Sequence, residues 1–294
     1  MALFPEARAA VEAAAADLPV WSEGYDVAAA REANRTNALA EPPEDIAEVI
    51  DLDAEGVGVR LYRPDVAVPG VVVHLHGGGF VFHDLDVHDR PCRRFANRLG
   101  MAVLSVDYRL APEHRFPAAP DDVDTVLAWL ERDGASIVGG GPTYVHGDSA
   151  GGNLALVAAL RNPGRFDAAV LHYPFLDPTA GFASYELGAA AAFDPREAAW
   201  YWQQYAGGPA DLTDPDLAPL LSDRLGTLPP TLVTTAEHDP LRDEGEHLAA
   251  LVAEQGGQVT AVRYLGQIHG FWRHAAFPAS EQLIHQTCAF LRGV

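Results

Sequence analysis

The chain has 294 residues, of which 48% are hydrophobic and 21% charged, a balance that allows a buried core and argues against disorder. All 20 basic residues are arginine, against 41 acidic residues, so the net charge is −21. The lack of lysine excludes a Walker A phosphate site, a pyridoxal Schiff base and a Ser–Lys catalytic pair. The negative charge repels phosphate backbones, so we expect no nucleic-acid partner.

The cysteine content and the hydropathy of the sequence indicate the cellular compartment in which the protein is expected. Cys92 and Cys288 are too few for a disulfide framework, and neither lies in a CxxC pair. The first twenty residues lack the basic start and apolar stretch of a secretory signal. No run approaches the roughly 18 apolar residues of a membrane span. We therefore expect a cytoplasmic protein without a membrane span.

The predicted elements alternate between strands and helices along most of the chain. Residues 1–45 read as helical and end at the breaker Pro42-Pro43. Alternating or apolar runs then predict strands at about 48–52, 57–62, 71–75, 101–106, 143–145, 168–171, 231–234 and 259–264. Helices are expected at about 86–99, 118–132, 149–161, 241–256 and 279–292. The alternation predicts an α/β fold, a mostly parallel sheet of about eight strands with helices on both faces.

Two segments do not fit this alternation. They are residues 1–45 and residues 179–222, the second of which is rich in Ala, Tyr and Trp. An N-terminal arm and an insertion after a late strand would together form a helical cap over the C-terminal edge of the sheet. The expected organisation is a catalytic domain over 46–178 and 223–294, with a cap arm at 1–45 and a cap insertion at 179–222.

The strongest motif is the sequence GDSAGG at residues 147–152, which directly follows a predicted strand and opens a predicted helix. In that context G-x-S-x-G is typical of a sharp turn that projects a strained serine above the sheet. The helix N-terminus next to it favours developing negative charge. Ser149 is therefore the candidate nucleophile; the alternative is an ordinary capping serine on a glycine-rich helix start.

A second motif, HGGGF at residues 76–80, follows the predicted strand 71–75. Three successive glycines allow the backbone to approach a ligand closely, and their N–H groups can converge on an oxyanion. A glycine run alone also fits a flexible turn. Its place after a strand and ahead of the serine motif favours an oxyanion loop.

The acid and the base are expected after the late strands, in the order nucleophile, acid, base. Asp239 lies in the loop after the predicted strand 231–235, just before Pro240, and is the candidate acid; Asp243 and Glu237 are its rivals. His269 follows the last predicted strand between two glycines; His274 and His285 are the other late histidines.

These motifs, together with DYRLAPEHRFPAA at residues 107–119 and HGF at 269–271, resemble the hormone-sensitive-lipase-like esterases of the α/β-hydrolase fold. The likeness covers about residues 46–292. It implies hydrolysis of carboxylic esters without a cofactor, with Ser149 as nucleophile, His269 as base and Asp239 as orienting acid. The oxyanion donors it implies are the backbone N–H groups of Gly78, Gly79 and Ala150. A peptidase or amidase using the same triad, a lyase, and a receptor of this fold are the alternatives; the receptors replace the catalytic histidine, which is present here.

Substrate and partners are indicated only weakly. Phe80, Phe82 and Trp202 are the candidates to line an apolar substrate pocket. The negative charge disfavours anionic substrates and lipid aggregates, so we expect small neutral esters of short to medium acyl chain. We expect no metal ion, since the histidines have no HExxH spacing, and the resemblance suggests a homodimer.

Overall fold

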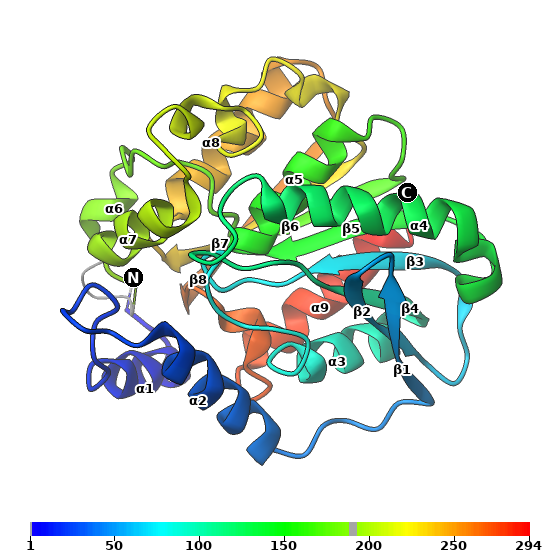
Figure 1. Ribbon diagram of the computed structural model, residues 1–294, viewed down its shortest axis with the longest axis horizontal. Helices are drawn as coiled ribbons and strands as arrows, with labels where there is room; N and C mark the ends of the chain where they lie inside the picture. Colours follow the sequence, from blue (N-terminus) through cyan, green and yellow to red (C-terminus); the bar gives the residue numbers. More distant parts are fainter. Residues whose placement is uncertain (1, 188–192) are drawn as a thin grey trace.

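The computed structural model describes residues 2–187 and 193–294 (Figure 1). Its centre is one eight-stranded sheet in the order β1-β2-β4-β3-β5-β6-β7-β8. The strands are β1 (Glu48–Ala54), β2 (Val57–Arg63), β3 (Val68–Leu75), β4 (Met101–Asp107), β5 (Thr143–Asp148), β6 (Ala168–His172), β7 (Thr231–His238) and β8 (Val259–Ile268). The pairs β1–β2 and β2–β4 are antiparallel and the other pairs are parallel. The predicted fold class, an α/β-hydrolase sheet, is confirmed.

Helices cover both faces of the sheet, as Figure 1 shows. The helices on one face are α4 (Ala118–Val138), α5 (Ala150–Arg161) and α8 (Arg242–Glu254). On the other face lie α3 (Asp89–Leu99) and α9 (Pro278–Leu291). Single turns of 3-10 helix are η2 (Asp211–Thr213), η3 (Pro219–Leu221), η4 (Leu225–Thr227) and η5 (Phe271–Arg273). No described helix has the length and hydropathy to cross a membrane.

The alternation of side chains along β3 explains the two-sided core. Val71, Val73 and Leu75 join the apolar cluster beneath α4, α5 and α8, whereas Val72 joins the cluster beneath α3 and α9. All four side chains are at most 1% exposed. A strand buried on both faces is apolar throughout because neither side of it meets water. Where β3 breaks this rule it carries His74, which is also fully buried.

Four helices lie at the C-terminal edge of the sheet, where the parallel strands end (Figure 1). They are α1 (Pro5–Ala14), α2 (Val27–Ala40), α6 (Ser184–Leu187) and α7 (Pro195–Tyr205). The helical expectation for 1–45 is only partly met, since residues 15–26 form turns between α1 and α2. Asp26 begins α2 by accepting a hydrogen bond from Ala29 N at 3.0 Å. Below, the described residues of the segments 2–40 and 184–205 are called the cap; residues 188–192 of the expected cap insertion lie outside the described residues.

Two boundaries differ from the sequence expectation in ways that affect the site. Helix α4 continues to Val138, six residues beyond its expected end, before three glycines lead into β5. Strand β8 continues past Tyr264 to Ile268, with a register shift against β7. The longer β8 delivers His269 directly from the end of a strand.

Candidate active site

Ser149 occupies a strained turn between β5 and α5. Its backbone has φ 56° and ψ −120°, a region that non-glycine residues rarely adopt. Two glycines make the turn possible: a Cβ on Gly147 would lie 2.0 Å from the Gly151 carbonyl oxygen, and one on Gly151 2.0 Å from that of Leu75. Ser149 N donates to His172 O at 2.9 Å, which fixes the turn to β6. The serine is thus held above the sheet edge, where parallel strands end.

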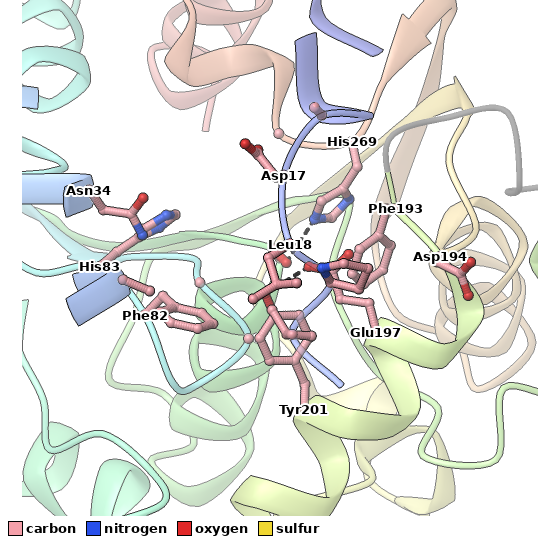
Figure 2. Close-up of a pocket in the computed structure, with 18 of the residues that line it drawn as sticks. Asp17, Leu18, Asn34, Phe82, His83, Phe193, Asp194, Glu197, Tyr201 and His269 are labelled. Atoms are coloured by element: carbon pink, nitrogen blue, oxygen red, sulfur yellow. Dashed lines mark hydrogen bonds between the residues drawn. The ribbon is translucent and has the colours of Figure 1, made fainter. Parts of the chain in front are cut away.

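The three residues expected to act together meet in one hydrogen-bonded row, of which Figure 2 labels His269. Ser149 Oγ lies 2.9 Å from His269 Nε2, and His269 Nδ1 lies 2.8 Å from Asp239 Oδ2. The second carboxylate oxygen, Asp239 Oδ1, accepts from Leu241 N at 2.8 Å. Asp239 is 2% exposed. A buried carboxylate with both oxygens engaged can hold the imidazole in the tautomer that accepts the serine proton.

The rival acids and bases serve other contacts. Asp243 accepts from Ser184 N at 2.9 Å and pairs with Arg242. Glu237 accepts from Gly266 N at 2.7 Å, beneath the loop that carries His269. His285 pairs with Glu281 on the exposed side of α9. None of these three residues lines the pocket that contains Ser149.

The glycine loop after β3 is fixed from below. Asp148 Oδ1 accepts from Gly77 N at 3.0 Å, and the Tyr108 hydroxyl donates to His76 O at 2.6 Å. Gly78 and Gly79 have φ of 117° and 61°, and both line the pocket beside Ser149. Within the described residues, the N–H groups of Gly78, Gly79 and Ala150 have no protein acceptor. Free amides at a helix start and a glycine turn can receive a developing negative charge.

The pocket above these residues has a volume of about 840 Å³. Ser149, His269 and the glycine loop lie at its floor, and its walls come from both parts of the cap. In Figure 2, Asn34 and His83 lie on one side of His269, and Phe193, Asp194 and Glu197 lie on the other. The N-terminal arm contributes Asp17 and Leu18 across the opening.

Of the three aromatic residues expected to contact substrate, only Phe82 lines the pocket. Phe80 is 1% exposed and stacks on Tyr205 with ring centroids 3.8 Å apart. Trp202 is 2% exposed and packs on Phe175, 4.3 Å between centroids. The expectation for Phe80 and Trp202 is wrong, because these rings hold the cap on the catalytic core instead of facing the substrate.

Sequence reasoning missed the pocket residues of α7 and the arm. Phe193 stacks on the imidazole of His269, with ring centroids 5.1 Å apart and planes at 17°. Glu197 and Tyr201 lie one helical turn apart on α7, joined by a hydrogen bond of 2.9 Å. The i, i+4 spacing of a carboxylate and a phenol was the available signal, since such residues share a helix face.

A row of histidines lies beneath the active site, in the core between the sheet and α3. His74 on β3 and His146 on β5 are register partners, and His172 on β6 follows on the same face. Together with His76 and His88 they are at most 1% exposed. Burial lowers the pKa of each: to about 4 for His76, to about 3 for His172, and well below the usual range for the others. These imidazoles are neutral at pH 7.

The hydrogen bonds between rings form one directed chain. Arg273 can only donate, so His83 Nε2, 3.5 Å from its Nη1, is an acceptor. His83 Nδ1–H then donates to His88 Nε2 at 3.3 Å, and His88 Nδ1–H to His74 Nε2 at 3.1 Å. His74 Nδ1–H donates to His146 Nδ1 at 2.8 Å. The proton of His146 is thereby placed on Nε2, which has no partner among the described residues.

The fold also brings His74, His88 and Asp148 together, although their sequence spacing suggests no metal motif. One ligand atom from each lies within 4.8 Å of the others, and all three are buried. Two of these atoms, His74 Nε2 and His88 Nδ1, are already joined by the hydrogen bond of 3.1 Å. The bond accounts for both nitrogens without a metal ion, and we assign none.

The chain is similar to known α/β hydrolases and esterases. Residues 72–273 match the family described as alpha/beta hydrolase fold. The carboxylic ester hydrolase LipN of Mycobacterium tuberculosis is 38% identical over 84% of this chain and 70% of its own length. The ethyl acetate hydrolase of Pseudomonas putida is 36% identical over 75% of this chain and 73% of its own. A hyperthermophilic esterase from Pyrobaculum calidifontis superposes with a TM-score of 0.88 at 36% identity, covering 100% of this chain and 99% of that one.

The chain therefore belongs to the α/β-hydrolase family and, within it, to the hormone-sensitive-lipase-like esterases. It is an enzyme of the carboxylic ester hydrolase class.

Proposed function

We propose that the protein is a serine carboxylesterase that hydrolyses small neutral esters of short to medium acyl chain. The observation that carries the proposal is the hydrogen-bonded row Ser149–His269–Asp239, with distances of 2.9 and 2.8 Å. Ser149 and His269 of this row lie at the floor of the pocket. It is supported by the free amides of Gly78 and Gly79 on the same floor.

In the proposed reaction His269 Nε2 takes the hydroxyl proton of Ser149 as Oγ attacks the ester carbonyl. Asp239 stabilises the imidazolium that forms. The tetrahedral oxyanion accepts hydrogen bonds from the amides of Gly78, Gly79 and Ala150, and each such donor is worth about 2.7–4 kcal/mol in comparable sites. Collapse expels the alcohol, which takes the proton from His269. His269 then takes a proton from the water that attacks the acyl-enzyme, and it returns this proton to Ser149 Oγ as the bond to the acyl group breaks and the acid is released.

The size and lining of the pocket support the proposed substrate range. Its walls include aromatic and small apolar residues of the cap, and its volume of about 840 Å³ suits a small molecule. The net charge of −21 disfavours anionic esters and anionic lipid surfaces.

The test is initial-rate hydrolysis of p-nitrophenyl esters from C2 to C16 by the wild type and by Ser149→Ala. We expect wild-type kcat/KM to peak at C4–C6, and the variant to be folded by circular dichroism and without turnover above background. Turnover retained by Ser149→Ala would contradict the nucleophile. A wild-type maximum at C12–C16 with activation at a lipid interface would contradict the substrate range.

A further inference from the structure

The pocket contains an acidic side chain for which ester hydrolysis has no use. Glu197 points from α7 into the pocket, beside Phe193 and Tyr201 (Figure 2). Its Oε1 accepts the Tyr201 hydroxyl at 2.9 Å. Among the described residues no arginine or histidine nitrogen forms an ion pair with its carboxylate. Burial raises the pKa of Glu197, while the Tyr201 hydroxyl and nearby His269 act in the opposite direction.

This carboxylate lies close to the reacting atoms. Tyr201, to which it is bonded, packs its ring on the oxyanion loop: a Cβ on Gly79 would lie 2.2 Å from that ring. Phe193, on the other side, stacks on the imidazole of His269. A substrate group that meets Glu197 is therefore only a few atoms from the scissile carbonyl.

Aromatic rings surround the same part of the pocket. Tyr25, Phe82, Phe193 and Tyr201 all line it. Phe82 contacts both tyrosines, with centroids 6.3 Å from Tyr25 and 6.0 Å from Tyr201. Aromatic faces attract ammonium groups, and the attraction grows when water is excluded. A carboxylate among such rings offers a cation both a counter-charge and a polarisable wall.

The arginines of the pocket do not compete for Glu197. Arg196 pairs with Asp194 at 2.8 Å and lies over the Trp21 ring. Arg273 donates to His83, which Figure 2 shows on the opposite side of the pocket from Glu197. The net charge of −21 also raises the local concentration of cations.

We propose that Glu197 and the surrounding aromatic rings form an ammonium subsite, so that short esters carrying an ammonium group near the scissile bond are preferred substrates. The inference rests on the proposed esterase function and extends its substrate class from neutral to cationic esters. The ammonium group can belong to the alcohol or to the acyl half, and both halves present the same chemistry to Glu197.

Two pairs of esters, matched in shape, test the subsite and distinguish the two halves. Choline butyrate is compared with 3,3-dimethylbutyl butyrate, and ethyl 4-aminobutyrate with ethyl pentanoate, at pH 8. Within each pair only a positive charge is added. We expect the wild type to favour the cation in one pair by about tenfold in kcat/KM, mainly through a lower KM. The pair that shows the preference identifies the half that carries the ammonium group.

Two variants assign the preference to one carboxylate. In Glu197→Gln, whose amide oxygen still accepts from Tyr201, the ratio of cationic to neutral kcat/KM is expected to fall to about one. Asp17→Asn removes an exposed charge from the same pocket and is expected to keep the ratio. The neutral ester is the internal reference in each protein.

If the wild type hydrolyses the cationic and the neutral ester of each pair with equal kcat/KM, the subsite is overturned, and the variants are not needed to reach that conclusion. An equal loss of preference in Asp17→Asn would also overturn it, because the cause would then be the general field of the protein. No turnover of any of the four esters would overturn the proposed esterase function itself, whereas turnover of the neutral esters alone would contradict only the subsite.

Discussion

The orientation of one imidazole decides the chemistry at the residue scale. His269 is delivered by the end of β8, and its Nδ1 meets a carboxylate whose other oxygen is bonded to Leu241 N. Because that oxygen is occupied, Asp239 cannot rotate away without leaving a buried amide unpaired. The proton of a neutral His269 is thus held on Nδ1, and Nε2 stays available to Ser149.

Asp239→Asn tests this orientation. The amide can donate to Nδ1, which favours the tautomer with its proton on Nε2 and blocks proton transfer from Ser149. We expect kcat for p-nitrophenyl butyrate to fall by about 10⁴-fold with little change in KM. Asp243→Asn, the rival acid, is the control and is expected to stay within a few fold of wild type. A larger loss of kcat in Asp243→Asn than in Asp239→Asn would instead identify Asp243 as the acid that orients His269.

The sequence predicts which residues form the candidate site better than it predicts which way a side chain faces. Ser149, Asp239 and His269 could be proposed from the sequence because each follows a strand in a fixed order, and hydrogen bonds join them in the structure. The sequence could not show in the same way which of Trp202 and Glu197 faces the core and which faces the pocket. They share α7, and a helix turns its side chains by about 100° per residue, so one faces the core and the other the pocket. Which face was which depended on how the cap packs, and no local pattern encodes that.

At the scale of elements, the contact between α5 and β3 sets the position of the serine. Gly151, in the first turn of α5, touches the backbone of β3 so closely that a Cβ would lie 2.0 Å from the Leu75 oxygen. The contact holds the nucleophile turn and the oxyanion loop at one spacing, since that loop leaves directly from β3.

Gly151→Ala is expected to be destabilised by about 3 kcal/mol or more, because backbone, unlike a side-chain tip, cannot move aside cheaply. Urea unfolding followed by circular dichroism gives the free energy of unfolding. Gly208→Ala is the control, because a Cβ there meets nothing within 4 Å, and its midpoint is expected to be unchanged. Wild-type stability in Gly151→Ala would show that α5 can shift away from β3.

The element pattern also shows where sequence reasoning fails. Strands and helices around the sheet were predictable because a strand buried on both faces is apolar and a covering helix is amphipathic. The stretch 15–26 was expected to be helical from its alanine-rich flank, yet it forms turns over the pocket. Alanine propensity is a weak preference that Pro19 and the packing of the arm override.

For the molecule as a whole, the buried histidines tie stability to pH. An unfolded histidine takes up a proton near pH 6.5, but His76 does so only at about 4 and His172 at about 3 in the folded protein. The unfolded chain therefore binds more protons as pH falls through this interval, which favours unfolding. Buried Asp148 and Glu244, whose pKa values are raised, act in the opposite direction.

We expect the free energy of unfolding to be flat from pH 8 to 7 and to fall by several kcal/mol between pH 6.5 and 5. Each histidine that stays neutral in the folded protein contributes up to about 1.4 kcal/mol per pH unit. Urea titrations at half-unit intervals measure the slope, and reversal on return to pH 8 excludes irreversible damage. A stability unchanged between pH 6.5 and 5 would contradict the neutral histidine row.

The N-terminal arm forms hydrogen bonds with segments on two sides of the candidate active site. Phe4 N donates to Gly266 O at 3.0 Å, three residues before His269. Arg31 donates to the carbonyls of Val81 and Ala111, beyond the glycine loop. Between these attachments, several of the residues 15–26 line the pocket. Mutations in that stretch can therefore change which esters bind without changing the groups proposed to perform the reaction. This separation would allow the substrate range of such an enzyme to diverge during evolution while hydrolytic activity is retained.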